Sequence, residues 1–382
     1  MPKKSIQEIN EKIKGGKAVV LTAEEVSAMG REQSAAEIAR KVDVVTTATF
    51  GPMCSSGMFI NTGHSDPPMR IESATLNGVP VFSGIAAVDL YIGATENHPE
   101  KPSYGGAHLI EALIAGEDLE LVAHAKGTDC YPRRDIRTTI NRDNINEMLM
   151  FNPRNAYQNY PVAVNRTGQT KYTYMGSLLP RMGNANYSTS GELSPLLNDP
   201  DLRTIGMGTR IFLGGTQGYV GWYGSQYNSS AELNEHGVPV SNAATLALMG
   251  DGREMSSEFI RAAYYEKYGV SLFVGVGIPI PVLDEDMAAR LMIRNDQITT
   301  RVVDYGDPSH PELGRVDYAT LMSGEFELEG KKIRTSSLSS LYTARRIADI
   351  LKKEVAGGSF QLTEAVMSFP KGKGLNSMEA DR

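Results

Sequence analysis

Apolar and polar positions alternate between helical and extended spacing at the start of the chain. Isoleucines recur at helical spacing in residues 5–14, and residues 18–22 form a short apolar run. Residues 24–42 return to helical spacing, and residues 43–50 form a β-branched run that ends at Gly51-Pro52. The pattern predicts a helix followed by a strand-helix-strand unit.

The rest of the chain continues this rhythm of helices and strands. We expect helices at 107–115, 256–268, 285–290 and 341–355, and one beginning near Asp135. We expect strands at 119–125 and 270–280 and a hairpin at 327–335. Residues 151–200 are rich in Asn, Tyr, Gly and Pro, with weak periodicity, which predicts loops and short antiparallel strands laid over the site.

Together these elements predict an α/β fold. Strands separated by helices favour a mostly parallel or mixed sheet core with flanking helices, and the irregular region adds a partly antiparallel layer. No internal repeat or low-complexity linker divides the chain, so we expect a single domain over residues 1–382. In such sheets ligands gather beyond the C-terminal ends of the strands.

Composition narrows the class of protein. The chain has 41% hydrophobic and 22% charged residues and a net charge of -7. A net negative charge argues against nucleic acid as a partner, because binding of the phosphate backbone needs a basic surface. The sequence holds no apolar run long enough to span a membrane, and charges occupy the N-terminus. We expect a cytoplasmic protein.

The two cysteines, Cys54 and Cys130, lie far apart and neither belongs to a Cys-x-x-Cys pair. Thiolates of this chain alone therefore cannot ligate a zinc ribbon or an iron-sulfur cluster, and we expect no metal site. Any cluster would belong to another protein. In the absence of other signals, both cysteines would be read as small buried hydrophobic residues.

Cys54 follows a predicted strand and stands among glycines and two serines within residues 46–69. Backbone amides or a helix N-terminus pointing at the sulfur would stabilise its thiolate, which is the nucleophilic form. His64 and Asp66 follow shortly after, and such a pair could move protons for the thiol or for a carbonyl oxygen. His64 could equally be a turn residue bonded within its own loop.

Cys130 lies in a second cluster that is rich in arginine. Positive charge near sulfur favours the thiolate. Arg133, Arg134 and Arg137 could bind a substrate carboxylate, and Asp129 could hold an ammonium group. The competing interpretation is a solvated network of ion pairs.

Other motifs are missing from the sequence. It contains no Walker sequence, no strand-linked Gly-x-Gly-x-x-Gly with a trailing acid and no His-Glu-x-x-His helix. Phosphate-cofactor and zinc-enzyme interpretations both lose support.

The segments VDVVTTATFGPMCSSGMFINTGHSDPP and KGTDCYPRRDIRTTINRDNINEM make the chain resemble a known family. It is similar to the homocysteine biosynthesis proteins of methanogens and other anaerobes, the L-aspartate semialdehyde sulfurtransferases, over nearly its whole length. The resemblance implies reductive insertion of sulfur into the aldehyde of aspartate semialdehyde. It also implies a separate ferredoxin-like, NIL-module iron-sulfur protein as electron donor. Family members with appended CBS modules exist, and this chain stops without them.

The family's essential cysteine falls on Cys54 and its second cysteine on Cys130. Our hypothesis is that Cys54 accepts sulfane sulfur as a persulfide, whose terminal sulfur adds to the aldehyde. Electrons then cleave the sulfur-sulfur bond and remove the carbonyl oxygen. Cys130 would be a relay or resolving thiol, and His64 the acid for the departing oxygen. Aldehyde plus sulfide plus two electrons gives thiol plus water, so a chain without a redox centre needs an external donor.

Two other functions stay open at this point. A transferase or isomerase of the CoA-transferase or sugar-phosphate type would hold an acyl or phosphate group in its glycine loops and would not need Cys54. A non-catalytic sulfur carrier would load sulfur on Cys54 but would not bind aspartate semialdehyde. The sequence also leaves open a homo-oligomer and the identity of the sulfur donor.

Overall fold

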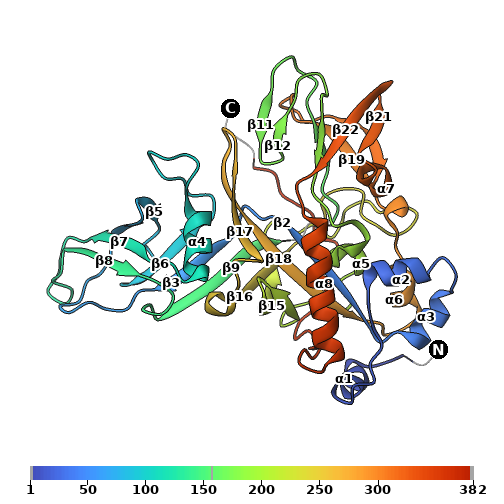
Figure 1. Cartoon of the computed structure of the whole chain (residues 1–382), viewed down its shortest axis with the longest axis horizontal. Coiled ribbons are helices and arrows are strands. Elements are labelled where there is room, and N and C mark those ends of the chain that lie inside the picture. Colours follow the sequence, from blue (N-terminus) through green and yellow to red (C-terminus); the bar gives the residue numbers. More distant parts are fainter. Residues whose placement is uncertain (1–2, 156–157, 379–382) are drawn as a thin grey trace.

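The computed structural model describes residues 3–155 and 158–378. Within these residues strands and helices are mixed, and the strands form sheets of ten, six, four and two strands (Figure 1). This arrangement agrees with the α/β class expected from the sequence.

The chain begins with helix α1 (Ile6–Lys14), whose first turn is fixed by its own sequence. The Ser5 hydroxyl accepts a hydrogen bond from the Glu8 amide, and the Glu8 carboxylate accepts one from the Ser5 amide. This reciprocal capping satisfies two amides that a helix start leaves unpaired. Ile9 and Ile13 bury the apolar face of the helix.

The predicted strand-helix-strand unit follows and is confirmed. It comprises β1 (Val20–Thr22), α2 (Ala23–Met29), α3 (Ala35–Lys41) and β2 (Val44–Pro52). Strands β1 and β2 pair in parallel. The single helix expected over 24–42 is two helices, because α2 ends at Gly30 and a new cap at Ser34 starts α3.

The ten-stranded sheet forms the centre of the molecule. Its strands in order are β1, β2, β18 (Gly269–Pro281), β14 (Arg210–Leu213), β15 (Thr216–Tyr223), β16 (Leu246–Asp251), β9 (Glu147–Asn155), β3 (Gly57–Asn61) and β6 (Asp89–Gly93), with β17 (Ile260–Tyr265) paired to β18. Only β1 and β2 pair in parallel among these, and the other pairings are antiparallel. Of the two sheet types expected, the structure has the mixed one.

Helix α8 (Leu341–Ala356) lies across β2 and β18 on one face of this sheet (Figure 1). Ala344, Ile347 and Leu351 are fully buried along its inner face. Helix α4 (Gly106–Ala115) packs against β17, and α6 (Glu285–Leu291) packs against α3. Helices α8 and α4 therefore cover parts of the large sheet with their buried apolar residues.

A six-stranded sheet stands beside the large one, at the upper right of Figure 1. Its strands in order are β20 (Glu312–Asp317), β19 (Thr299–Asp304), β10 (Val162–Val164), β13 (Ala185–Tyr187), β22 (Lys331–Ser337) and β21 (Glu325–Leu328). Several short elements lie between or beside these strands in chain order. They are the hairpin of β11 (Lys171–Thr173) and β12 (Gly176–Leu178), the helices α5 (Pro195–Asn198) and α7 (Tyr318–Met322), and the turns η1 (Gly191–Leu193) and η3 (Asn295–Gln297). A second cluster of buried apolar residues fills this region.

A four-stranded sheet lies on the opposite side, at the left of Figure 1. Its strands in order are β5 (Val79–Val81), β4 (Ser73–Leu76), β7 (Leu119–His124) and β8 (Asp135–Ile140). The turn η2 (Gly252–Glu254) belongs to the large sheet's side and contacts β9. Most side chains of β8 are exposed, so one face of this sheet is open to solvent.

Two predicted helices are wrong. Residues 256–268 contain β17, which pairs along β18 from Ile260 to Tyr265. The helix expected near Asp135 is β8, which pairs with β7. In both segments pairing with a neighbouring strand overrides a weak local helical pattern, since tertiary context outweighs intrinsic propensity.

The described part of the chain contains no helix that is both long and apolar enough to cross a bilayer. The division into a single domain over residues 1–382 stays a prediction, and so does the absence of further modules.

Candidate functional site

Cys54 lies in the short loop between β2 and β3, two residues after β2 ends at Pro52. The side chain is partly buried, and its sulfur lies 3.2 Å from the hydroxyl oxygen of Ser271 on β18. Ser271 itself is fully buried. The sequence places the thiol beyond a strand end, and the antiparallel pairing of β2 with β18 places a hydroxyl next to it.

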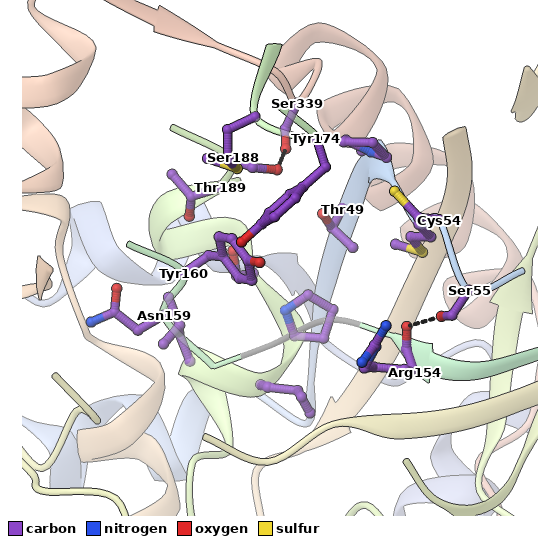
Figure 2. A pocket seen from close by; sticks show the side chains of 18 of the residues that line it. Thr49, Cys54, Ser55, Arg154, Asn159, Tyr160, Tyr174, Ser188, Thr189 and Ser339 are labelled. Carbon is purple, nitrogen blue, oxygen red and sulfur yellow. Dashed lines mark hydrogen bonds between the residues drawn. The ribbon is translucent and has the colours of Figure 1, made fainter. Parts of the chain in front are cut away.

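Hydrogen bonds fix the Cys54 loop against β9. The Ser55 hydroxyl donates to the Arg154 carbonyl oxygen at 3.1 Å (Figure 2). The Ser56 hydroxyl donates to the Met53 carbonyl oxygen at 2.6 Å, and the Asn152 side-chain amide donates to the Ser56 hydroxyl at 2.9 Å. Because Asn152 and Ser56 are both buried, these bonds hold the loop backbone in one conformation.

A cavity of about 430 Å³ opens beside Cys54. We call it the larger cavity. Its lining comes from the end of β2, the Cys54 loop, β9 and the region 159–197 that joins the large sheet to the six-stranded sheet. Figure 2 shows Tyr174 projecting toward the middle, with Cys54 on one side and Thr189 on the other. This volume is in the range of sites for small molecules.

Tyrosines form one wall of the larger cavity. Tyr160, Tyr174 and Tyr268 all line it. The ring of Tyr174 makes edge contacts with the rings of Tyr160 and Tyr268, at centroid distances of 6.2 and 6.1 Å. The Tyr174 hydroxyl is 2.8 Å from that of Tyr305. Aromatic contacts of this kind hold the β11–β12 hairpin over the site.

Gly51 lies where another side chain would not fit. A Cβ atom at this position would lie 2.7 Å from the hydroxyl oxygen of Ser339, which lies 2.8 Å from the hydroxyl oxygen of Ser188. All three residues line the larger cavity. The glycine before Pro52 therefore allows β2 to approach the Ser188–Ser339 pair closely.

A second cavity of about 420 Å³ meets the first at Cys54. We call it the smaller cavity. Cys54, Ser55, Arg154 and Tyr268 line both cavities. The remaining lining of the smaller cavity is Thr95, Asn97, Gly269 and Val270. The thiol is therefore reached from two sides.

The cysteine affects the tyrosines around it. Burial raises the pKa of Tyr265, and repulsion between its phenolate and an ionised Cys54 would raise it further. Burial also raises the pKa of Tyr268, with Cys54 and Tyr174 acting in the same direction and Arg154 against it. Both hydroxyls therefore keep their protons at neutral pH. The Tyr265 hydroxyl is buried and has no hydrogen-bond partner among the described residues.

The residues of the arginine-rich cluster lie on the four-stranded sheet and its loops, and none of them lines either cavity. Cys130 is exposed, with its sulfur 3.6 Å from the Thr128 hydroxyl. His64 is exposed, and its ring stacks at 6.1 Å from that of Tyr131. The structure thus separates Cys130 and His64 from the cavities at Cys54.

The charged residues of that cluster have local partners. Arg133 donates to the carbonyl oxygens of Asp66 and Pro67. Arg137 donates to the Glu120 carboxylate at 2.6 Å. Arg134 and Asp129 are exposed. The substrate-binding roles of Arg133, Arg134, Arg137 and Asp129 stay predictions, as do the catalytic roles of Cys130 and His64.

Sequence reasoning missed three residues at the Cys54 site: Arg154, Tyr268 and Ser271. Tyr268 carries no local signal, because it lies in the segment 256–268 whose spacing fits a helix. Ser271 carries none either, because only the pairing of β2 with β18 brings it to Cys54. Arg154 does carry one, since it is the only charged residue between Glu147 and Arg166. An isolated charge in a long uncharged stretch indicates a specific partner or ligand.

No group of three or more His, Cys, Asp or Glu side chains is placed to hold a metal ion in the described part of the chain. The sequence-based expectation that this chain's cysteines bind no cofactor stays a prediction.

Comparison with known proteins shows which family the chain belongs to. Residues 18–362 match the model of a family described as homocysteine biosynthesis enzyme, sulfur-incorporation. The L-aspartate semialdehyde sulfurtransferase of Methanosarcina acetivorans is 47% identical over 382 residues, covering 99% of this chain and 74% of the relative. That of Methanocaldococcus jannaschii is 46% identical over 381 residues, covering 95% and 72%.

A third relative, an uncharacterized protein of Methanothermobacter thermautotrophicus, is 30% identical over 353 residues and covers 89% of this chain and 77% of the relative. No solved structure matches. The family model covers most of the chain and includes the strand, loop and cavities around Cys54. The chain therefore belongs to the homocysteine biosynthesis enzymes that incorporate sulfur.

Proposed function

We propose that this enzyme converts L-aspartate semialdehyde to L-homocysteine by reductive sulfur insertion, with Cys54 carrying the sulfur as a persulfide. Two relatives that cover nearly the whole chain are named for that aldehyde as sulfur acceptor. The observation that carries the proposal is the position of Cys54. It is the only thiol that lines either cavity, and it lies where the two cavities meet.

Sulfur loading is a transfer without net oxidation. The Cys54 thiolate attacks the sulfane sulfur of a donor persulfide, a new S–S bond forms on Cys54, and the donor leaves as a thiolate. The Ser271 hydroxyl, 3.2 Å from the sulfur, can donate a hydrogen bond to the anionic form. Arg154 adds a positive charge to the lining of both cavities. Both groups can stabilise the negative charge on the sulfur atoms during the transfer.

The persulfide then attacks the aldehyde. A C–S bond forms and the carbonyl oxygen becomes a hydroxyl. Two electrons cleave the S–S bond, which returns the Cys54 thiolate and releases a hydroxythiol. Loss of water gives a C=S group, and two further electrons with two protons reduce it to the thiol. The route from sulfane sulfur thus consumes four electrons, and the same product from sulfide consumes two.

These electrons need a source outside the chain. Its two cysteines are too few to hold an iron-sulfur cluster, which takes about four cysteine ligands. We propose a ferredoxin-like protein with a NIL module as the donor. Its iron-sulfur clusters would deliver electrons at the Cys54 loop, where the S–S bond forms.

Tyr268 can assist at the carbonyl oxygen. It lines both cavities beside Cys54, and its raised pKa keeps the phenol protonated. A protonated phenol donates a hydrogen bond to an oxygen that gains negative charge during the attack. His64, the acid that the sequence suggests, would have to reach this point from outside the cavity lining. To act as a relay thiol, Cys130 would also have to reach Cys54 from outside the cavity lining.

The two cavities allow the two reactants to approach Cys54 from different sides. The larger cavity has the tyrosine wall and the polar groups suited to an amino-acid aldehyde. The smaller cavity has exposed rim residues, Thr95 and Asn97, through which a sulfur donor can arrive. In this arrangement a loaded persulfide faces the aldehyde without the donor having to leave through the same opening.

The test is intact-mass analysis after incubation with a sulfane sulfur donor, followed by peptide mapping. We expect one added sulfur on the peptide that contains Cys54. Aspartate semialdehyde and the reduced partner should then release homocysteine. Cys54→Ser should lose both results while it keeps its circular dichroism spectrum. Full turnover in Cys54→Ser would contradict the mechanism and support a transferase of the CoA or isomerase type.

Two further measurements separate the remaining alternatives. Sulfur loading without binding of aspartate semialdehyde would support a non-catalytic carrier. Cys130→Ser, measured in parallel, tests the relay thiol, because a relay predicts that its loss prevents sulfur from reaching Cys54.

A further inference from the structure

Arg154 is the only charged side chain that lines either cavity at Cys54, as far as the described residues go. Within residues 3–155 and 158–378, no Asp, Glu or Lys contributes to either lining. Apart from the sulfur of Cys54 itself, a ligand in these cavities therefore meets one fixed positive charge and no carboxylate among the described lining residues. Such a lining favours a ligand with an anionic group.

The Arg154 guanidinium has no ion-pair partner among the described residues, although it is partly buried. Several other arginines of the chain do have such partners. Arg203 lies 2.6 Å from the Asp284 carboxylate, and Arg345 lies 2.8 Å from that of Glu24. An unpaired, partly buried guanidinium beside a cavity indicates a site for an external anion.

The backbone of Arg154 is fixed at both polar groups. Its amide donates to the Asn152 side-chain oxygen at 3.0 Å, and its carbonyl oxygen accepts from the Ser55 hydroxyl at 3.1 Å. Ser55 is the neighbour of Cys54. The guanidinium is thus carried by a backbone that is tied directly to the loop of the thiol, as Figure 2 shows.

Tyr268 lies within electrostatic reach of both Cys54 and Arg154. Burial raises the pKa of Tyr268, the charge of Cys54 raises it further, and the charge of Arg154 acts in the opposite direction. All three line both cavities. The positive charge therefore lies close enough to the reacting sulfur for one small molecule to touch both.

We propose that Arg154 binds the α-carboxylate of the amino-acid aldehyde in the larger cavity and so directs the aldehyde carbon toward Cys54. This inference rests on the proposed function and names the group that selects its substrate. Three carbon–carbon bonds separate the carboxylate carbon from the aldehyde carbon in aspartate semialdehyde. A planar guanidinium can hold the carboxylate by two parallel hydrogen bonds, which fixes direction as well as position.

The carboxylate subsite predicts specificity. An aldehyde without the carboxylate loses the paired hydrogen bonds and leaves the guanidinium unpaired again. It should be a poorer substrate even though its reacting group is unchanged. Arg154→Lys keeps the charge but not the fork of donors, so it should restore only part of the binding.

The experiment combines a change in the enzyme with a change in the substrate. Wild type, Arg154→Gln, Arg154→Lys and the exposed control Arg40→Gln are assayed with aspartate semialdehyde and with 3-aminopropanal, which lacks the carboxylate. We expect Arg154→Gln to raise KM for aspartate semialdehyde about 10- to 100-fold, with a smaller rise in Arg154→Lys. With 3-aminopropanal the wild type and Arg154→Gln should have nearly the same KM. Arg40→Gln should match wild type throughout.

Two further measurements, ligand binding and sulfur loading of Cys54, test the carboxylate subsite separately from the proposed function. Calorimetry with L-homoserine, which carries the carboxylate but cannot react, should show binding to wild type and weaker binding to Arg154→Gln by the same factor. Sulfur loading of Cys54 should reach the same end point in both. Binding of homoserine without homocysteine formation would overturn the proposed function and leave the subsite supported.

Four results would overturn the subsite itself. The first is an unchanged KM for aspartate semialdehyde in Arg154→Gln. The second is an equal loss with both aldehydes, which would indicate a structural role. The third is a raised KM in Arg134→Gln in place of Arg154→Gln, which would move the carboxylate to the cluster around Cys130. Absence of homoserine binding to wild type also contradicts the subsite.

Discussion

The sulfur of Cys54 lies 3.2 Å from the hydroxyl oxygen of Ser271, although 217 positions separate the two residues in sequence. The pairing of β2 with β18 brings them together, because Pro52 at the end of β2 is opposite Phe273. Ser271 is fully buried, so its hydroxyl has few partners other than this sulfur. The contact gives the sulfur a hydroxyl partner, which can act as a hydrogen-bond donor to the thiolate form.

Ser271→Ala removes that donor, and we expect it to slow the alkylation of Cys54 by iodoacetamide about 10-fold. Hydrogen bonds to an anion are stronger than neutral ones, so the reactive thiolate loses more than the thiol. The exposed Cys130 serves as an internal reference in the same sample. Ser27→Ala, which removes a buried hydroxyl bonded to Glu192, is the matched control and should leave the Cys54 rate unchanged. Equal Cys54 rates in wild type and Ser271→Ala would contradict the role of the contact.

Gly51→Ala should destabilise the protein by about 1–3 kcal/mol, the usual range for overpacking. The new Cβ would lie 2.7 Å from the Ser339 hydroxyl oxygen and would displace it from Ser188. Urea unfolding measures the change. Ser339→Ala removes the atom that clashes, so the double variant should recover part of the loss. Strict additivity of the two single variants would show that the clash is not the cause.

Asp43→Asn tests a buried ion pair far from the cavities. Burial raises the pKa of Asp43, but the ion pairs with Lys12 at 2.6 Å and Lys4 at 3.1 Å and the bond from the Val19 amide outweigh it, so the pKa lies below its usual value. We expect a loss of about 3 kcal/mol at pH 7, because the two ammonium groups lose their anion. The lysines are partly exposed, which keeps the loss at the lower end of that range.

The pH dependence of this ion pair follows from the direction of the Asp43 pKa shift, which is downward. A depressed carboxyl pKa stabilises the fold fully above the unfolded value, about 3.9, and the contribution disappears as pH falls through the folded pKa. The gap between wild type and Asp43→Asn in urea unfolding should therefore be constant from pH 7 to about 5 and narrow below about 4. The exposed Asp143→Asn is the control. A gap that widens on acidification would contradict this assignment.

Thr95→Phe tests the separate approach of the two reactants. Thr95 lines the smaller cavity and not the larger one. A phenyl ring there should slow sulfur loading of Cys54 several-fold and leave KM for the aldehyde unchanged. Thr139→Phe, on the exposed face of β8, is the control for an added aromatic side chain. A raised KM with normal loading would assign the smaller cavity to the aldehyde instead.

The sequence predicts much of the local structure, and the reasons are local. The bonds between Ser5 and Glu8 that start α1 join residues three positions apart, and the glycine turn at Gly330 closes the predicted hairpin within a few residues. The segment 256–268 shows where prediction from local sequence fails. Its spacing fits a helix, but pairing with β18 along its length makes it a strand.

The residues of this chain, taken in order, determined the helix caps, the strand that leads to Cys54, the presence of only two thiols and the family. The tertiary structure alone decided which groups surround that thiol. Ser271, Tyr268 and Arg154 meet Cys54 because strands distant in sequence pair side by side, and such pairing depends on burial across the whole sheet. No short stretch of sequence encodes that contact, so the lone charge of Arg154 acquires its meaning only when the sheet has formed.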